Sequence, residues 1–467
     1  MPSRLSKFMI DTNSCKDFTH PWTDSCMSAQ VGLGLHALQE SLRIYSTVYL
    51  IALLMRRKIP SKKDILRTIL GILQSTAFLS WSAYTYPVFI CTLRKLLGNF
   101  NIITVSFLPS FLSSLAAIII ERPSRRTLLC LYVANIATET LFRMIVWRGY
   151  IEPIPYGNVY IFGASMATLL YFFRSEKPKS DSIFKILKFI VGPYDDPENA
   201  KRQVLYSEPS TSKNINYQMN HKTDIKRRKI HSYNLIQESL KVYQNLINWI
   251  KNCARHNSCP HPYSCLHFIL GGSVKMFGIG LCTQLGLNLI FKFKKFMTKP
   301  SLLKAELFKK NNFNLALFIG GFSGIYRLAS CLLRNVSNKN SRLHAIPAGL
   351  IASVSFAMFP NNTIALYVMW KSLQLLWNNG VEAGKLPEIK WFNIFFYCFC
   401  TAILFHAAII EPQNLRGSYW KFLCTISGGR VAAMARKPLD PFGLETSRHL
   451  QEVLKKTNTT DYFPYSY

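Results

Sequence analysis

The sequence is short of charged residues, and above all of acidic ones. Only 17% of its 467 residues are charged, and 24 Asp and Glu stand against 56 Lys and Arg. Ordinary soluble domains carry about 25% charged residues, so this composition argues against a chain built wholly of such domains. Hydrophobic residues make up 49% of the chain, and its mean hydropathy is +0.11. Together these values favour a membrane protein.

The familiar motifs of enzymes are also missing. The sequence contains no glycine-rich phosphate loop of the Walker type, no GxSxG and no HExxH. These motifs hold phosphates, nucleophiles or catalytic zinc, and without them no catalytic residue can be assigned. We therefore expect a protein without enzymatic activity and without a cofactor.

The basic charge that is present follows the apolar segments. A net charge of +32 is common in nucleic-acid-binding proteins, but here Lys and Arg gather in short clusters beside apolar runs. Examples are MRRKIPSKK (55–63) and FKFKKFMTK (291–299). Basic loops in such places contact anionic headgroups and help to fix topology. We predict a lipid bilayer as partner, and no nucleic acid.

Apolar segments close to membrane-spanning length recur along the chain. Helices satisfy their own backbone hydrogen bonds in lipid, so the predicted fold class is an all-α, multi-pass transmembrane helical bundle. Not every segment needs to span. The ten candidate segments cover residues 31–55, 71–98, 101–120, 127–147, 157–173, 268–291, 313–334, 343–359, 363–378 and 391–410.

The two halves of the chain carry similar short patterns in the same order, which predicts two sequence repeats of four to five helices each. Four helices per half would place the basic loop after the first span on one face in both halves, whereas five would invert the second half; the positive-inside rule favours four. The matched pairs, whose offset drifts only from 241 to 233, are His20 with His261, Cys26 with Cys265, Pro60 with Pro300, Tyr132 with Tyr367, Gly149 with Gly384 and Lys188 with Lys421.

Composition and repeats predict five parts of the chain. Most of the polar stretch after the first half should be solvated linker, although FKILKFIV (184–191) could lie on a membrane surface. The linker contains the basic run Lys226, Arg227, Arg228 and Lys229. The five parts are a Cys-containing N-terminal segment (1–30), a first membrane repeat (31–192), a basic polar linker (193–252), a second membrane repeat with a Cys/His-rich start (253–429) and a polar C-terminal tail (430–467).

Each half begins with a Cys/His box, CKDFTHPWTDSC (15–26) and CARHNSCPHPYSC (253–265). Thiolate and imidazole suit zinc, but the spacing follows no standard zinc pattern and neither box holds a CxxC pair. A structural turn, a disulfide or redox role, and a metal site all stay open, because His-Pro favours extended backbone and Ser can cap the next helix. The residues concerned are Cys15, His20, Cys26, Cys253, His256, Cys259, His261 and Cys265.

Two pairs of charged residues lie inside apolar segments. Glu139 and Arg143 are four residues apart, and Glu40 and Arg43 are three apart, so each pair shares a helical face. Ionisable residues at membrane depth are functional candidates because they are costly in lipid. A structural pair facing the bundle explains the same spacing.

Small residues gather in GGFSGIYRLAS (320–330) and PAGLIAS (347–353). Helices approach closely where small residues face one another in membranes. The residues expected to pack in this way are Gly320, Gly321, Gly324 and Gly349.

Four stretches of the chain, with the first Cys/His box, resemble the transmembrane protein 135 family, also called peroxisomal membrane protein 52. They are ALQESLRIYSTVYLIALLMRRK (37–58), ANIATETLFRMIVWRG (134–149), RLHAIPAGLIA (342–352) and RGSYWKFL (416–423). Residues 313–367 are similar, more weakly, to the glycine-rich helices of the mitochondrial Tim translocase family.

The resemblance implies a multi-pass membrane protein of mitochondria and/or peroxisomes. Its implied function is to regulate the balance of mitochondrial fission and fusion, with a dynamin-related fission GTPase as partner, and to act in peroxisome organisation and lipid homeostasis. The alternative is a transporter or channel for a lipid or small metabolite, with its pathway between the two repeats. The family provides no catalytic residues to carry over, and nothing in the sequence indicates the oligomeric state.

Overall fold

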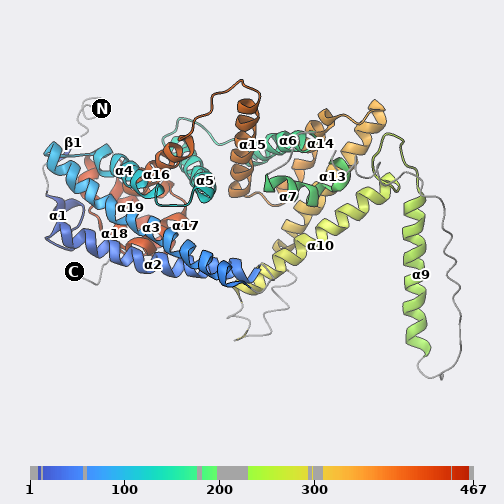
Figure 1. The fold of residues 1–467 in the computed structure, drawn as a ribbon, viewed down its shortest axis with the longest axis horizontal. Coiled ribbons are helices and arrows are strands. Elements are labelled where there is room, and N and C mark those ends of the chain that lie inside the picture. The colour runs from blue at the N-terminus through green and yellow to red at the C-terminus, as the bar shows by residue number, and fades with distance from the viewer. Residues whose placement is uncertain are drawn as a thin grey trace. The chain divides into compact units, whose positions relative to one another are not determined.

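The computed structural model describes residues 9–11, 14–55, 60–175, 181–196, 230–292, 297, 309–442 and 444–461. The described chain is dominated by helices (Figure 1), and a short antiparallel pairing joins β1 (Met9–Asp11) to β2 (Phe100–Asn101). The predicted all-α class is therefore confirmed. The chain divides into two compact units: unit 1 is Met1–Pro153 with Trp377–Tyr467, and unit 2 is Ile154–Leu376.

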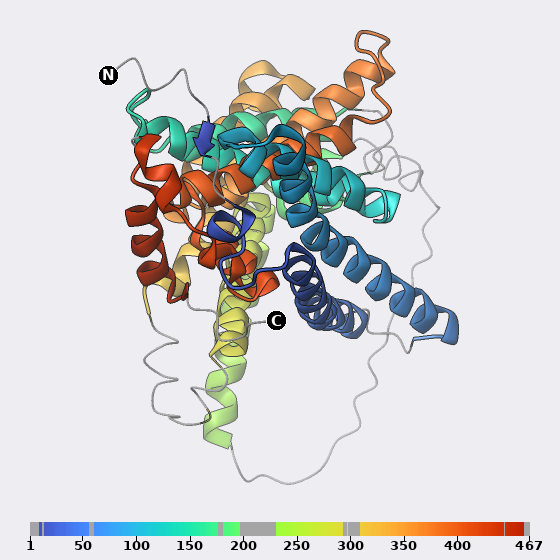
Figure 2. The same cartoon turned by 90° about the vertical axis from the view of Figure 1, so that its left-hand side faces the viewer.

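Unit 1 is built on two long helices, α2 and α3, that pack along each other (Figure 2). The other helices of the unit pack against this pair or against one another. A Ser61–Asp64 capping box begins the second long helix, and Gly98, at φ +73°, ends it. The helices are α1 (Cys15–Phe18), α2 (Cys26–Met55), α3 (Lys62–Leu97), α4 (Leu108–Ile118), α5 (Pro123–Trp147), α16 (Phe392–Ile410), α17 (Gly417–Ser427), α18 (Arg430–Ala433) and α19 (Thr446–Thr457), with a π-helix at Ile103–Phe107.

Unit 2 is organised around two helices of 27 residues that pack along each other, α10 and α13 (Figure 1). Its core contains stacked aromatic rings, of which Phe162 and Phe356 have centroids 4.2 Å apart. The helices are α6 (Gly157–Phe173), α7 (Ser182–Val191), α9 (Ile230–Asn252), α10 (Cys265–Phe291), α13 (Asn311–Ser337), α14 (Ala345–Ala352) and the first part of α15 (Asn362–Glu382).

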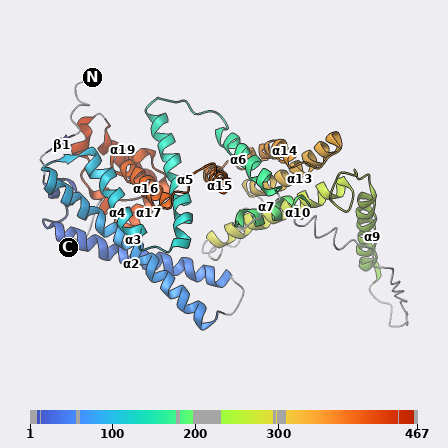
Figure 3. The same ribbon diagram turned by 45° about the horizontal axis from the view of Figure 1, so that its top comes forward.

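The units do not follow the predicted halves of the chain. Helices α6 and α7, predicted in the first repeat, belong to unit 2, whereas α16 and α17, predicted in the second, belong to unit 1. Figure 3 shows α16 beside α5, and α6 beside α14. The physical reason is burial: α16 is apolar almost all round and covers its side chains against α4 and α5. The predicted boundaries at 192 and 253 concern sequence repeats and stay a prediction, while the compact units cut across them.

The predicted basic polar linker, 193–252, contains helical elements in its described parts. The 3-10 turn Pro193–Asp195 buries the carboxylate of Asp195, and α9 occupies Ile230–Asn252. The described side chains of α9 are mostly exposed, as in a solvated segment, whereas that of Asp195 is buried. Lys226, Arg227, Arg228 and Lys229 lie outside the described residues.

Four helices among the described residues are long and apolar enough to cross a membrane. They are Pro123–Trp147 of α5, Cys265–Ile290 of α10, Asn311–Ser337 of α13 and Phe392–Ile410 of α16. Shorter apolar helices cover Ile103–Ile118, Gly157–Phe173 and Arg342–Met358. Four of the ten predicted segments are thus long and apolar enough to span a membrane, among the residues that the structure describes. These helices indicate that the chain is a membrane protein.

The predicted glycines lie at close contacts inside unit 2. A Cβ on Gly320 would lie 2.8 Å from Phe277 Cβ of α10, and one on Gly324 would lie 2.9 Å from Ser273 Oγ. In α14, a Cβ on Gly349 would lie 3.0 Å from Leu170 Cδ1. The remaining predicted glycine, Gly321, would meet Ser355 Cβ at 3.2 Å.

The α10–α13 contact gives a first testable prediction. A Cβ on Gly280 would lie 2.8 Å from the Cα of Ala316, so Gly280→Ala must push two helix backbones apart. We expect a loss of about 1–3 kcal/mol of stability. Gly278→Ala is the matched control, because nothing lies within 4 Å of its added Cβ. Thermal unfolding in detergent measures both variants, and equal stabilities would contradict the close contact.

Candidate functional site

Unit 1 contains a partly open, apolar cavity of about 260 Å³. This volume is near the lower end of the range for small-molecule pockets, about 300–1,000 Å³. Its walls come from α2, α3, α5, α16, α17 and the segments beside them. Among the lining side chains are Phe78, Tyr86, Ile90, Tyr397, Phe405 and Leu423.

Aromatic contacts and a proline shape this cavity. The Phe78 ring lies 6.2 Å from Tyr397, and Tyr86 lies 4.8 Å from Phe405, so α3 and α16 are braced by rings. Pro87 lies within α3 and has no N–H to donate to the carbonyl of Ala83. Both residues line the cavity. The carbonyl of Ala83 therefore lacks the backbone N–H donor that a helix normally provides. It is a hydrogen-bond acceptor in a cavity wall that is otherwise mostly apolar.

A few polar groups also reach the cavity. Arg430 is 6% exposed, and its Nη1 donates to the carbonyl of Ser427 at 3.2 Å. Burial lowers the pKa of Arg430 from its ordinary value, because the apolar surroundings disfavour the charged form. His20 and Thr401 lie in the same lining. The cavity therefore combines an apolar interior with a buried cation, which suits an amphiphile.

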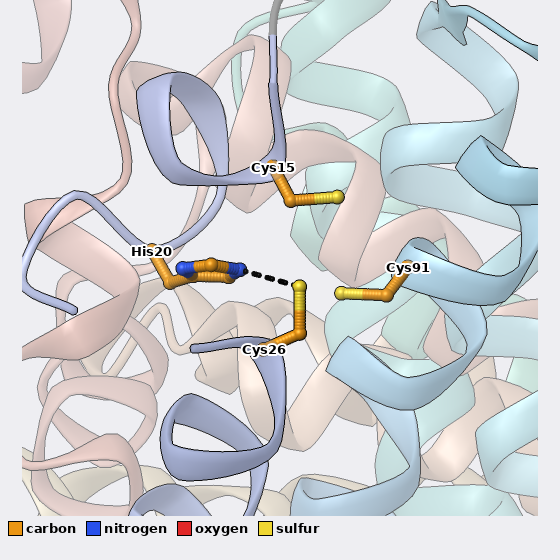
Figure 4. A group of neighbouring side chains, drawn as sticks. All are labelled: Cys15, His20, Cys26 and Cys91. Atoms are coloured by element: carbon orange, nitrogen blue, oxygen red, sulfur yellow. Dashed lines mark hydrogen bonds between the residues drawn. The ribbon is translucent and has the colours of Figure 1, made fainter. Parts of the chain in front are cut away.

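Next to this cavity lies a first Cys/His cluster, defined as Cys15, His20, Cys26 and Cys91 and drawn in Figure 4. Cys15 begins α1, Cys26 begins α2, and His20 lies in the turn between them. Cys91 comes from α3, which packs along α2. One ligand atom from each residue lies within 4.8 Å of all the others, and His20 Nε2 lies 3.3 Å from Cys26 Sγ.

The surroundings of the first cluster favour the thiolate form of Cys15 and the protonated, positively charged form of His20. Hydrogen bonds from Cys91 and then His20 lower the pKa of the Cys15 thiol to about 5. Burial lowers the pKa of His20, but its hydrogen bonds to Cys15, the Thr23 carbonyl and Cys26 outweigh burial and raise it to about 9. Thiolate is the form of cysteine that binds metals and attacks electrophiles.

A second cluster in unit 2 has the same composition, three cysteines and one histidine: Cys259, His261, Cys265 and Cys331. Its ligand atoms also lie within 4.8 Å of one another. Cys265 begins α10, and Cys331 comes from α13, which packs along α10. Here burial lowers the pKa of His261 and raises that of Cys259, which favours a neutral imidazole and a protonated Cys259 thiol.

Cys253 and His256, from the second box, belong to neither cluster. The Cys253 thiol donates to the carbonyl of Trp249 at 3.3 Å, and His256 Nδ1 accepts from the backbone N–H of Ser258 at 3.3 Å. Each contact is local. The other six predicted Cys and His residues are divided between the two clusters, three in each.

Sequence reasoning missed Cys91 and Cys331, the residues that complete the clusters. They stand in apolar helices, where cysteine usually packs as a small hydrophobe. One signal could have found them: their offset is 331 − 91 = 240, within the range of the other repeat pairs.

The predicted pair Glu139 and Arg143 forms an ion pair with Arg143 Nη2 2.5 Å from Glu139 Oε1. Arg416, which sequence reasoning missed, contacts the other carboxylate oxygen of Glu139. Glu139 is 7% exposed, so two guanidinium groups satisfy a buried carboxylate and tie α5 to the start of α17. Glu40 and Arg43 lie 3.8 Å apart in α2, where the Arg43 side chain is 79% exposed.

Residues 12–146 of the chain match the family model described as the N-terminal cysteine-rich region of Transmembrane protein 135. The matched range contains the whole first cluster and the Glu139–Arg143 pair. No solved structure matches the chain. The similarity to the Tim translocase family stays a prediction.

Proposed function

This chain belongs to the transmembrane protein 135 family, and from that premise we propose that it is a membrane protein that binds a lipid in the cavity of unit 1. The proposed function is lipid homeostasis in mitochondria and/or peroxisomes, without enzymatic chemistry of its own. The single observation that carries the proposal is the apolar cavity with a buried guanidinium group in its wall.

The chemistry of the cavity selects the class of ligand. Burial of apolar surface contributes about 25 cal/mol per Å², so acyl chains and sterols gain most from such a wall. Arg430 can receive a carboxylate or phosphate, and the Ala83 carbonyl can accept a hydrogen bond from a hydroxyl group. A fatty acid, an anionic phospholipid chain or a sterol fits this combination, whereas a fully polar metabolite does not.

Two sequence repeats form part of the proposal. Gly149 follows α5 and Gly384 follows α15, and both have left-handed backbone, at φ +76° and +69°. The exchange of late helices is also reciprocal, since unit 1 takes α16 and α17 while unit 2 takes α6 and α7. These parallels support two related sequence repeats. A lipid pathway between them, as in a transporter, is the corresponding alternative.

Filling the cavity should abolish lipid binding. Ala83 lines the cavity on α3, so we expect Ala83→Trp to occupy the space and lower the affinity for a photoreactive fatty acid or sterol by about tenfold or more. Ala77→Trp on the exposed face of the same helix is the matched control and should bind normally. Equal saturable binding by both variants in detergent would overturn the proposed site.

We also propose that the chain helps to recruit a dynamin-related fission GTPase and so biases mitochondrial fission and peroxisome organisation. Helix α9 supports a recruiting surface because its apolar side chains lie exposed. They are Val242, Tyr243, Leu246 and Trp249, which are 67%, 59%, 52% and 64% exposed.

Deletion of residues 197–229 tests the recruiting role without removing the buried Asp195. We expect the deletion, and the replacement of Lys226, Arg227, Arg228 and Lys229 by Gln, to lower recruitment of the GTPase to organelles and to lengthen mitochondria. Imaging of the organelles and of the bound GTPase measures this. Unchanged recruitment with a normally folded protein would refute the role of the basic run.

A further inference from the structure

We propose that each of the two Cys/His clusters binds one Zn²⁺ ion in a closed, tetrahedral, structural site. The first site uses Cys15, His20, Cys26 and Cys91, and the second uses Cys259, His261, Cys265 and Cys331. Three thiolates and one imidazole form one of the standard ligand sets of structural zinc. The second of these sites is independent of the lipid cavity, because no residue of its cluster lines the cavity.

The spacing of the ligand atoms fits a zinc ion. With Zn–S at about 2.3 Å and Zn–N at about 2.0–2.1 Å, tetrahedral angles place two sulfurs about 3.8 Å apart, and a nitrogen and a sulfur about 3.6 Å apart. In the second cluster, Cys259 Sγ lies 3.8 Å from Cys265 Sγ, and His261 Nε2 lies 3.6 Å from Cys331 Sγ. These two separations match edges of the tetrahedron that a zinc ion would impose, and His20 Nε2 and Cys26 Sγ of the first cluster lie somewhat closer, at 3.3 Å.

The same distances separate the proposal from a disulfide. A disulfide bond holds two sulfurs about 2.05 Å apart, and the cysteines of both clusters are free thiols. A pair of disulfides would also leave the buried histidine of each cluster without a role. Coordination uses all four side chains in both places.

The imidazole of each cluster is oriented as in known zinc sites. His20 Nδ1 lies 2.9 Å from the Thr23 carbonyl, and His261 Nδ1 lies 2.7 Å from the Tyr263 carbonyl. Each carbonyl accepts from Nδ1–H, so in the neutral imidazole that binds a metal the lone pair is on Nε2, which faces a thiol of its cluster. Backbone carbonyls commonly fix metal-bound histidines in this way.

Charge around the second cluster also favours a metal–thiolate complex. Zn²⁺ with three thiolates and a neutral imidazole carries one net negative charge. Arg334 lies one helical turn after Cys331, is fully buried, and its Nη1 has no hydrogen-bond partner among the described residues. Arg174 and Arg334 share the one carboxylate of Asp195. The excess buried positive charge would be offset by the anionic complex.

The arrangement of elements explains what the ions would do. In both units the metal would join the first residue of one long helix to the middle or end of the helix packed along it, through Cys26 and Cys91 in unit 1 and Cys265 and Cys331 in unit 2. With all four positions filled by protein ligands, no coordination position is open to a substrate. Zinc would therefore clamp each helix pair rather than catalyse a reaction.

Metal analysis of the purified full-length protein, carrying an affinity tag without histidine, tests the proposal. We expect two zinc ions per chain in the wild type, one in Cys91→Ser, one in Cys331→Ser and none in the double variant. Cys253→Ser is the matched control, since Cys253 lies in the second box but outside the cluster, and should keep two ions. A wild type without stoichiometric zinc, or equal zinc loss in Cys253→Ser, would overturn the proposal.

X-ray absorption of the wild-type protein gives a test that does not depend on any variant folding. The expected first shell has three sulfurs at about 2.3 Å and one nitrogen at about 2.0–2.1 Å around each ion. A shell dominated by oxygen and nitrogen would refute the assigned ligands. Mapping of disulfides under non-reducing conditions should find the cluster thiols unlinked, and a disulfide within either cluster would equally refute the zinc sites.

Discussion

Asp195→Asn is expected to lower the stability of unit 2 by about 3–5 kcal/mol, the usual cost of removing one partner from a buried ion pair. The Asp195 carboxylate accepts from Arg174 Nη2 at 2.9 Å and also contacts Arg334 Nη2. All three side chains are at most 4% exposed. The neutral amide would leave two buried guanidinium groups without a counter-charge.

The pH dependence of this contribution has a defined sign. Burial raises the pKa of Asp195, but Arg174 and Arg334 outweigh burial and hold it well below its ordinary value. The stabilisation is therefore fully present above the unfolded pKa of about 3.9 and is lost as the pH falls through the folded pKa. The wild type should gain stability over Asp195→Asn as the pH rises from strong acid to neutral.

Thermal and denaturant unfolding of the detergent-purified variants measure this effect. Asp24→Asn is the control, because Asp24 pairs with Lys16 on an exposed surface where ion pairs contribute little. If Asp195→Asn and the wild type unfolded at the same temperature and denaturant concentration at neutral pH, the buried ion pairs would not stabilise unit 2.

Cys91→Ser is expected to weaken lipid binding by about tenfold or more, which corresponds to about 1.4 kcal/mol or more. His20 of the first cluster lines the cavity, and so does Ile90, the neighbour of Cys91. Loss of a metal at this cluster would free the segment before α2 and let one wall of the cavity move. This prediction rests on the lipid site and the first zinc site together.

The second cluster provides the control for that experiment. Cys331→Ser should also lose one zinc ion but keep lipid binding, because no residue of its cluster lines the cavity of unit 1. Equilibrium binding of the same photoreactive lipid compares the two variants. Equally weakened lipid binding in both variants would indicate general unfolding. Unchanged binding in both would show that the first cluster does not hold the cavity wall in place.

Local patterns were sufficient to predict part of the candidate site. The two boxes contain six of the eight cluster residues, since Cys, His, Pro and Ser close together mark a constrained turn. The fourth residue of each cluster lies far away in sequence: 91 − 26 = 65 and 331 − 265 = 66 residues from the cysteine that begins the helix. Only the packing of α3 along α2, and of α13 along α10, brings it near.

The fold shows the same division between local and long-range information. Apolar segments of nearly spanning length located many of the helices, because a long apolar run in a single stretch of sequence already indicates a buried or membrane helix. It could not assign α6 and α16 to their units, since either helix could cover an apolar face in the other bundle. Asp195 was missed for a related reason: its partners, Arg174 and Arg334, are respectively 21 and 139 residues away.

The most direct test of the proposed function is the site at which a bound lipid reacts with the purified wild-type protein. A fatty acid or sterol with a photoreactive group on its apolar end should bind saturably, and mass spectrometry should find the label on cavity residues of α3, α16 and α17, such as Phe78, Tyr86, Phe405 and Leu423. Competition by the unlabelled lipid should remove it. Labelling that does not saturate, or that spreads over the outer apolar faces of the helices and spares these residues, would contradict a lipid site in unit 1.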